Sequence, residues 1–562
     1  MEELRPLAES FGVTGVVFRG RMSSCLNHLV TRHASSASLA FFVCSQLKRT
    51  GRCQYYQNLV RKMRRDGEFA LKLCRRPYKG SELRRVCQQN HVCPYEVAKL
   101  VLPNATLVAT TYFQIFDSEI GSVFLNAFGK PLSRTVLILD EVHNLPRIAI
   151  ELTSTRLSLH TIQQTILEAK RYGLDSFRRL GVVLEHVIED YLQDMRETEL
   201  LLDPLLFNRQ VTRLVRIQNL SNFAGEMVKA GERLANQLVM EGKPAISYVH
   251  STGNFLLRWC MSQHRADVAY FISRYNSNSS AIHLELVALD PRWATQPILK
   301  GCHSSIHLSG TLQPITAHID LVGLPRETQI LQLPSPFSRN HVICLISLGV
   351  TTAMKHRSPD MFRKIAERIS EVSQATPHNV GVFVPSYSIL QALLANGLEA
   401  LINKQLFYER PGLSSSKNDR LVKEFKSKAD EGALLLGVLG GRNSEGEDYP
   451  GQEMETVVVV GVPYARPSPR ETVRIQYFEH QFPSKGRDYG YVLPALRCAS
   501  QAAGRSVRRL DERGAIVFLD DRYTTSYCNR FLPARISEEL VKVGDADGLL
   551  FHHLETFFGS SN

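Results

Sequence analysis

A chain of 562 residues is long enough for several hydrophobic cores, and we expect three or four domains. Its 67 Lys/Arg against 55 Asp/Glu give a net charge of +12, which favours an anionic polymer as partner. No stretch of 18 or more apolar residues occurs and the N-terminus is polar, which argues against a membrane span or signal peptide, so we expect a soluble intracellular protein, cytoplasmic in a prokaryote and nuclear in a eukaryote.

The first 95 residues divide into a short α/β remnant and a basic segment. Residues 1–20 are typical of a helix followed by a strand. Residues 21–95 are expected to be irregular, and between Arg61 and Arg85 they hold ten Lys/Arg but three Asp/Glu. Such a run is usually a solvated face, but its place among cysteines favours contact with nucleic acid.

Cysteines are concentrated in the same segment, where six of the eleven fall within the first 93 residues. None forms a C-x-x-C pair, so a small zinc finger is disfavoured. Four thiolates from separated segments suit a [4Fe–4S] cluster, in which each iron takes one protein ligand. Zinc and unligated thiols remain the alternatives.

Residues 96–150 return to an α/β pattern that ends in the stretch Val136–Leu145. Its apolar residues predict a buried strand, and Asp140 and Glu141 follow at the carboxyl end, where open α/β sheets bind ligands. Asp140 could hold the water shell of Mg²⁺, and Glu141 could polarise a water against a γ-phosphate. His143 and Asn144 could sense the phosphate state, whereas the plain alternative is a solvated acidic turn.

The remaining chain is expected to form an insertion and a second α/β domain. Residues 151–245 have a helical pattern throughout, and the β-rich stretch Val268–Leu312 lies in residues 246–334, which complete the first α/β domain. Residues 335–562 alternate strands and helices, with a loosely packed tail helix after about residue 540.

Two motifs of the second domain carry polar chemistry. The Gly-rich loop Gly440–Asp448 follows an apolar strand, so it should lie at a carboxyl sheet edge, although such a loop is often only a turn. Gln501, Arg505 and Arg508 have the spacing of one helix face. Two guanidiniums there could serve as arginine fingers for a γ-phosphate, the alternative being a basic surface helix.

Together these segments resemble the XPD-type helicases, the iron–sulfur family of superfamily 2 DNA helicases, over essentially the whole chain. Asp140–His143 stands in place of the DEAH box, with Val for Ala. The further matching segments are Phe18–Cys25, Thr106–Phe113, Leu308–Leu312 (motif III), Val382–Tyr387 (motif IV), Gly440–Asp448 (motif V) and Gln501–Arg508 (motif VI).

The resemblance implies an α/β fold with two RecA-like motor domains, an iron–sulfur segment at 21–95 and a helical arch at 151–245. Motor domain 1 would comprise residues 1–20, 96–150 and 246–334, incomplete at its N-terminus, and motor domain 2 residues 335–562. The implied activity is ATP- and Mg²⁺-dependent 5′→3′ unwinding of DNA in repair, on single strands and forks, without a membrane partner. Repair-complex proteins are further possible partners.

The resemblance also assigns residues. The cluster ligands would be Cys25, Cys44, Cys53 and Cys93, with Cys74 and Cys87 as spares. The catalytic set would be Asp140, Glu141, His143, Gln501, Arg505 and Arg508. Nucleotide would contact Asp140, Glu445, Gly446, Asp448, Arg505 and Arg508. Nucleic acid would contact Tyr112, Ser386, Tyr387 and Arg442.

The sequence departs from the family at the phosphate loop, because it contains no G-x-x-x-x-G-K-[ST]. XPD-type helicases carry this loop upstream of the cluster, so we expect an N-terminally truncated helicase that alone hydrolyses almost no ATP. The alternatives are a split protein, whose partner chain supplies the missing segment, and a non-catalytic DNA-binding relative.

Overall fold

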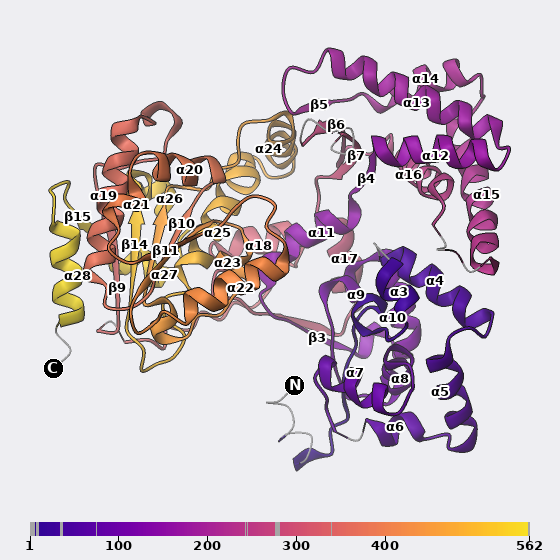
Figure 1. The fold of residues 1–562 in the computed structure, drawn as a ribbon, viewed down its shortest axis with the longest axis horizontal. Coiled ribbons are helices and arrows are strands. Elements are labelled where there is room, and N and C mark those ends of the chain that lie inside the picture. The colour runs from indigo at the N-terminus through magenta and orange to yellow at the C-terminus, as the bar shows by residue number, and fades with distance from the viewer. Residues whose placement is uncertain are drawn as a thin grey trace. The chain divides into compact units, whose positions relative to one another are not determined.

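The computed structural model describes residue 6 and residues 10–559, apart from residues 34–36, 75, 242, 244–245, 276–281 and 339. The chain forms two compact units, each considered by itself (Figure 1). The first unit comprises Met1–Leu308, Leu321–Leu324 and Ser468–Arg470; the second comprises Ser309–Asp320, Pro325–Pro467 and Glu471–Asn562.

The second unit is built on a seven-stranded sheet with the order β11-β12-β10-β13-β14-β9-β15. All its neighbouring strands pair in parallel. The strands are β9 (Val342–Ser347), β10 (Val380–Val384), β11 (Gln405–Tyr408), β12 (Ala433–Val438), β13 (Thr456–Val460), β14 (Gly514–Leu519) and β15 (Leu540–Val543).

The apolar runs of this unit explain its sheet. Every residue of β10, β13 and β14 is buried, as expected for strands of a parallel sheet that is covered on both faces. Helices α19 (Pro359–Ala375) and α20 (Tyr387–Ala395) contribute to the same core. The predicted alternation of strands and helices is therefore confirmed.

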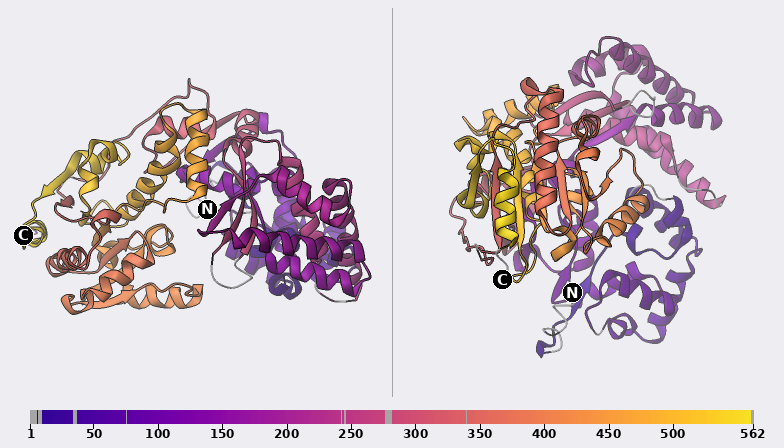
Figure 2. Two further views of the ribbon diagram at one scale, coloured as in Figure 1. Left: turned by 90° about the horizontal axis from the view of Figure 1, so that it is seen from above. Right: turned by 60° about the vertical axis from the view of Figure 1, so that its left-hand side comes forward.

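The C-terminal helix α28 (Leu549–Gly559) differs from its prediction. It lies beside α19 (Figures 1 and 2), and its Leu550 and Leu554 are buried in the core. The expectation of a loosely packed tail is therefore wrong, because these two leucines lie one helical turn apart and face the sheet domain together.

The first unit contains two pairs of parallel strands. β1 (Gly15–Val17) pairs with β2 (Leu107–Ala109), and β3 (Val136–Leu139) pairs with β8 (Ser304–His307). Nearby helices are α9 (Tyr112–Phe116), α10 (Ser118–Phe128), α11 (Leu145–Thr153) and α17 (Arg292–Gly301). One face of the β3–β8 pair is open, since Val136 is 50% exposed and Ile138 63% exposed. Parallel sheets are normally covered on both faces, so an open face on this pair is unusual.

A separate antiparallel sheet in the first unit has the order β4-β7-β6-β5. Its strands are β4 (Thr155–Ser158), β5 (Glu199–Leu201), β6 (Val268–Arg274) and β7 (Ile282–Ala288). The insertion expected to be helical throughout therefore carries two short strands. The stretch Val268–Leu312 was expected to complete the first α/β domain; of its described strands, β6 and β7 pair with the strands of the insertion and with each other, whereas β8 pairs with β3.

Helices pack on this antiparallel sheet around a shared core that includes Trp259 and Phe207. They are α12 (Leu159–Arg171), α13 (Asp175–Gln193), α14 (Pro204–Val215), α15 (Leu220–Met240) and α16 (Tyr248–Ser262). The indole nitrogen of Trp259 donates to Asn208 Oδ1 at 3.0 Å, which satisfies the only polar atom of this buried ring.

The cysteine segment is largely helical rather than irregular. Its longer helices are α4 (Ala37–Arg49), α5 (Gln54–Arg65), α7 (Gly80–Gln89) and α8 (Pro94–Val101). Helix α5 is amphipathic: Leu59 is buried, while Arg61, Arg64 and Arg65 are exposed. The basic run therefore begins on a helix face that is available to an anionic partner. Within the described ranges, every helix is too short or too polar to cross a bilayer.

Candidate nucleotide, nucleic-acid and cluster sites

The carboxylate pair lies at the carboxyl end of β3. Leu137 and Leu139 are buried and anchor the strand. The backbone of Leu308 fixes the loop that follows: its N–H donates to the carbonyl of Leu139 at 2.9 Å, and its carbonyl accepts the N–H of Val142 at 3.0 Å. The first residue of motif III is thus bonded directly to the strand and loop that carry Asp140.

The backbone of this loop turns the glutamate outward. Glu141 has φ 49° and ψ 42°, a left-handed conformation that is uncommon for residues other than glycine and often occurs at functional sites. Its side chain is 64% exposed, and its Oε2 lies 3.3 Å from Nδ1 of the buried His143. Nε2 of His143 lies 2.9 Å from Nδ2 of Asn144. Two exposed carboxylates with a buried imidazole behind them fit the predicted Mg²⁺ and water chemistry.

Tyr112, predicted to contact nucleic acid, lies at the same loop. It begins α9, and its hydroxyl donates a hydrogen bond to the carbonyl of Asp140. Burial and the nearby charges of Asp140 and Glu141 raise the pKa of Tyr112, so its hydroxyl stays protonated as a donor. The ring is half-buried, and stacking on a base stays a prediction for it.

The motif V loop is stabilised by hydrogen bonds among its own residues. Gly440 has φ 76°, which a glycine adopts without strain, and the short helix α23 (Arg442–Glu445) follows. The buried Ser444 donates to the carbonyls of Val438 and Gly441 at 3.2 and 2.9 Å. The loop is therefore a fixed structure rather than a plain turn.

Arg442, predicted to contact nucleic acid, is paired with acids. Its Nη2 lies 2.6 Å from Asp419 and 3.3 Å from Glu447. Its side chain is 48% exposed, so these are surface ion pairs of small strength. The predicted motif IV residues begin α20: Ser386 Oγ accepts the N–H of Ile389 at 3.4 Å, and Tyr387 is 37% exposed.

The prediction that Gln501, Arg505 and Arg508 share one helix face is wrong. Helix α25 (Leu493–Ala503) holds Gln501 in its last turn but ends before both arginines, at Gly504. Glycine is a poor helix former and a common helix end, and this was the signal in the sequence.

The guanidinium of Arg505 is hydrogen-bonded to the backbone of the motif V loop. It donates to the carbonyls of Ser444 at 3.1 Å and Glu447 at 2.7 Å, and also to that of Glu445. Three carbonyls on one guanidinium fix motif VI to motif V. Arg505 therefore has a structural role in this arrangement.

Arg508 is the freer of the two arginines. Its side chain is 38% exposed, and Nε lies 3.2 Å from Oδ1 of the exposed Asp448. Of the predicted nucleotide-binding residues in this loop, Glu445 offers its carbonyl to Arg505, and Gly446 donates its N–H to the carbonyl of Arg442 at 2.6 Å. Arg508 is thus the better candidate to reach a phosphate.

The four cysteines predicted as cluster ligands are neighbours. Cys25 and Cys53 belong to one buried group, with Cys44 packed against it. Burial raises the pKa of Cys25 to about 11, and the charges of Cys44 and Cys53 raise it further. Burial also raises the pKa of Cys93, and the charges of Cys25 and Cys44 raise this pKa further. Four thiols from four separate segments, three of them buried and that of Cys44 partly buried, suit a cluster, which replaces their protons when it binds.

Cys74 and Cys87 form a separate pair. Burial raises the pKa of each to about 12. The charge of Cys74 also raises the pKa of Cys87, and no other thiol contributes to that shift. The described residues contain no group of three or more His, Cys, Asp or Glu side chains that could hold a metal ion. A four-iron core holds its ligands farther apart than one ion does, so the ligand set stays a prediction.

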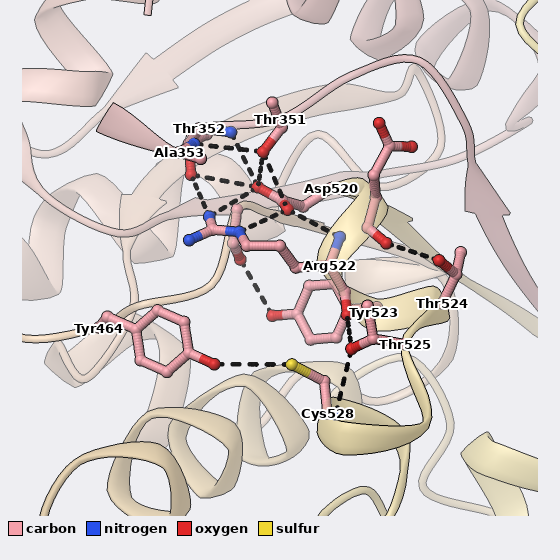
Figure 3. A network of polar contacts seen from close by, with 12 residues as sticks. Thr351, Thr352, Ala353, Tyr464, Asp520, Arg522, Tyr523, Thr524, Thr525 and Cys528 are labelled. Atoms are coloured by element: carbon pink, nitrogen blue, oxygen red, sulfur yellow. Dashed lines mark hydrogen bonds and ion pairs between the residues drawn. The ribbon is translucent and has the colours of Figure 1, made fainter. Parts of the chain in front are cut away.

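A polar network at the carboxyl edge of the second sheet was missed by the sequence analysis. The fully buried Asp520 follows β14, and its carboxylate accepts bonds from Arg522 Nε and Nη2 at 2.8 Å and from the N–H of Thr352 at 2.8 Å (Figure 3). The hydroxyl of Thr351 lies 3.2 Å from both carboxylate oxygens. The signal available in the sequence was Asp520 directly after an apolar strand.

The second unit is thus an α/β domain with its polar loops at strand ends, and the family models describe the same two-part plan. Residues 1–162 match the DEAD_2 family and residues 369–539 the helicase C-terminal domain. The chain belongs to the family of XPD-type superfamily 2 helicases.

Relatives and solved structures agree with this placement. The chain is 23% identical to the transcription and DNA repair factor IIH helicase subunit XPD of Dictyostelium discoideum, covering 79% of this chain and 66% of the relative. It is 25% identical to the ATP-dependent DNA helicase CHL1 of Coccidioides immitis, covering 85% and 61%. The chain therefore spans slightly less than two thirds of either relative's length.

The fold itself is that of XPD helicases. A solved XPD helicase structure matches with a TM-score of 0.61 and 18% identity, over 96% of this chain and 89% of that one. The structure of S. tokodaii Xpd4 matches with a TM-score of 0.54 and 17% identity, over 96% and 99%. The predicted α/β fold class is confirmed.

Proposed function

We propose that this protein is an ATP-dependent DNA helicase of the XPD type that moves 5′→3′ along a single strand and acts in DNA repair. The observation that carries the proposal is the exposed pair Asp140 and Glu141 at the end of β3, whose flanking residues Leu139 and Val142 are hydrogen-bonded to Leu308, the first residue of motif III. Asp140 would hold the water shell of Mg²⁺, and Glu141 would orient and polarise the water that attacks the γ-phosphate.

The other residues have supporting roles in this proposal. His143 holds the Glu141 carboxylate in place through its ring nitrogen. Arg508 stabilises the charge that develops on the γ-phosphate, while Arg505 keeps motif V and motif VI together. Gln501 lies on the turn before them.

We also propose that Cys25, Cys44, Cys53 and Cys93 hold a [4Fe–4S] cluster. Such a cluster supplies a covalent cross-link between four segments of chain, in a region too small to build a large core of its own. In this chain it would tie the start of α5 and the start of α8 to the turn after Arg21–Ser24.

A second candidate function rests on the sequence itself, which holds no G-x-x-x-x-G-K-[ST]. Without that loop, nucleotide finds no cradle of backbone N–H groups and no lysine at its β- and γ-phosphates. The 562 residues would then bind DNA without hydrolysing ATP, or would do so only together with a polypeptide that supplies the loop.

Both candidate functions predict tight, salt-sensitive binding of single-stranded DNA. The net charge of +12 and the exposed basic face of α5 imply that contacts with DNA phosphates dominate binding. The logarithm of the affinity should therefore fall linearly with the logarithm of the salt concentration. Fluorescence anisotropy with a labelled oligo-dT and with a duplex of equal length, from 50 to 200 mM salt, checks this.

We expect tighter binding to the single strand, because exposed tyrosines such as Tyr387 can stack on its bases. Equal affinity for the single strand and the duplex at moderate salt would contradict the single-strand binding path that a helicase needs. Protein that binds neither form would rule out both candidate functions.

A further inference from the structure

Strand β11 is an outermost strand of the second unit's sheet, and it is bonded in parallel to β12 on its inner side. The N–H of Glu409, directly after the strand, donates to the carbonyl of Leu436 in β12 at 3.0 Å. Successive residues of a strand direct their N–H and C=O groups to opposite sides, so those of Leu406 and Tyr408 point outward. Within the described part of the chain, these outward groups have no hydrogen-bond partner.

A hollow of about 370 Å³ lies at this strand. All of residues 406–408 line it, which places it along the strand edge, because alternate side chains of a strand point to opposite faces. Leu421 of helix α22 (Ser415–Lys426) contributes an apolar wall. The helix is fixed beside the strand, since the rings of Phe407 and Phe425 pack edge to face with their centres 6.0 Å apart. The hollow therefore combines apolar side chains with backbone groups that lack partners.

Two basic side chains, Arg410 and Lys417, line the same hollow. Both are exposed, and neither forms an ion pair with a carboxylate among the residues that the structure describes. Nη2 of Arg410 donates to the hydroxyl of Tyr408 at 3.1 Å, which keeps the guanidinium beside the end of the strand. An acidic group placed in the hollow would therefore meet two uncompensated cations.

The acids of the same elements do not neutralise these cations. Glu409 is buried, and its carboxylate accepts the N–H of Val438 at 3.1 Å, on the β12 side of the strand. Asp419 of α22 pairs with Arg442 at 2.6 Å, and neither Asp419 nor Glu424 lines the hollow. The charge that the hollow presents is therefore positive.

We propose that this edge binds an extended acidic segment of a partner protein, which adds as a further strand beside β11. The backbone of the segment would pair with the outward N–H and C=O groups of Leu406 and Tyr408. Its carboxylates would face Arg410 and Lys417. This inference goes beyond the proposed function, because it assigns a protein-docking surface that takes no part in hydrolysis or unwinding.

The outward backbone groups favour a peptide over a nucleic acid. A phosphodiester accepts hydrogen bonds but donates none, so DNA would supply no donor for the carbonyls of Leu406 and Tyr408. An extended peptide supplies donors and acceptors in alternation, at the spacing of a strand edge. The apolar wall of the hollow can also hold an aliphatic side chain of such a peptide.

The test is the fluorescence anisotropy of a labelled peptide, Glu-Val-Glu-Val-Glu-Val-Glu, titrated with the full chain. We expect saturable binding, and none by the peptide in which lysine replaces every glutamate. N-methylation separates strand addition from simple charge attraction. Of two peptides, one N-methylated at the valines and the other at the glutamates, only one should lose binding, because alternate N–H groups of a strand point to the same side.

Variants of the protein locate the site. Arg410→Glu and Lys417→Glu should each weaken peptide binding by about tenfold. Leu406→Pro should abolish it, because proline removes an outward N–H while sparing the bonds to β12. Lys542→Glu is the matched control: it makes the same charge change at an exposed lysine of β15, the opposite edge strand, and should leave binding unchanged.

Thermal melting of each variant is measured alongside. The charge variants are at exposed positions and should melt with the parent protein, so they keep the test valid if Leu406→Pro lowers the melting temperature. The absence of saturable binding, or equal binding by the parent and both charge variants, overturns the inference and leaves the proposed helicase function untouched. If oligo-dT displaces the peptide, and both charge variants lose affinity for oligo-dT in the same proportion, the edge binds DNA instead and the inference is also overturned.

Discussion

Glu141→Gln is expected to lower ATP turnover by about 10²–10⁴-fold in a protein that carries a phosphate loop, while leaving nucleotide binding intact. The reason is geometric: the Glu141 side chain projects from a left-handed backbone position into solvent, where it can orient a water but makes few structural contacts. Glutamine keeps the shape and loses the negative charge that polarises the water. Binding of a fluorescent ATP analogue and release of inorganic phosphate measure the two effects separately.

The two motif VI arginines provide the matched pair for this experiment. Arg508→Ala should slow hydrolysis by about 10³-fold, the order of an arginine finger, without changing the melting temperature, because the side chain is exposed. Arg505→Ala should lower the melting temperature as well, because it removes the donors to three motif V carbonyls. Equal effects of both substitutions on melting and on turnover would contradict this division of roles.

Serine in place of Cys25, Cys44, Cys53 or Cys93 is expected to abolish the visible absorption of the anaerobically purified protein. Parent protein should be brown and contain about four irons per chain. Each of the four thiols provides one ligand, and the surrounding core of α4 and α5 is small, so loss of one ligand should also destabilise the segment.

Cys74→Ser and Cys87→Ser are the controls for the cluster. They replace thiols that are equally buried but belong to the separate pair, so colour and iron content should persist. Loss of colour in either control would show that the ligand set is wrong. Stoichiometric zinc without visible absorption would contradict the cluster itself.

The strands of the second unit could be predicted because their residues carry the signal locally. Val380–Val384 and Thr456–Val460 are apolar or β-branched runs of strand length, and such runs are typical of buried parallel strands. Asp140 and Glu141 were found for the same reason, since a carboxylate pair directly after such a strand has a defined position.

Partners distant in sequence could not be predicted in the same way. The pattern of Val268–Arg274 identifies a strand but not its neighbours, which are β5 of the insertion and β7. Asp520 and Thr352 are 168 residues apart and meet only because β14 and β9 are adjacent. The predicted helix through motif VI extended too far toward the C-terminus, because residue spacing alone does not show that Gly504 ends the helix.

The most direct measurement is DNA-stimulated ATP hydrolysis by two proteins: the 562-residue chain, and the same chain fused to an XPD-family strand–loop–helix segment that carries G-x-x-x-x-G-K-[ST]. We expect almost no hydrolysis by the first, because its sequence holds no G-x-x-x-x-G-K-[ST], and DNA-stimulated hydrolysis by the second. Robust hydrolysis by the 562-residue chain alone would contradict this expectation, because the phosphates would then be held by residues other than those named above.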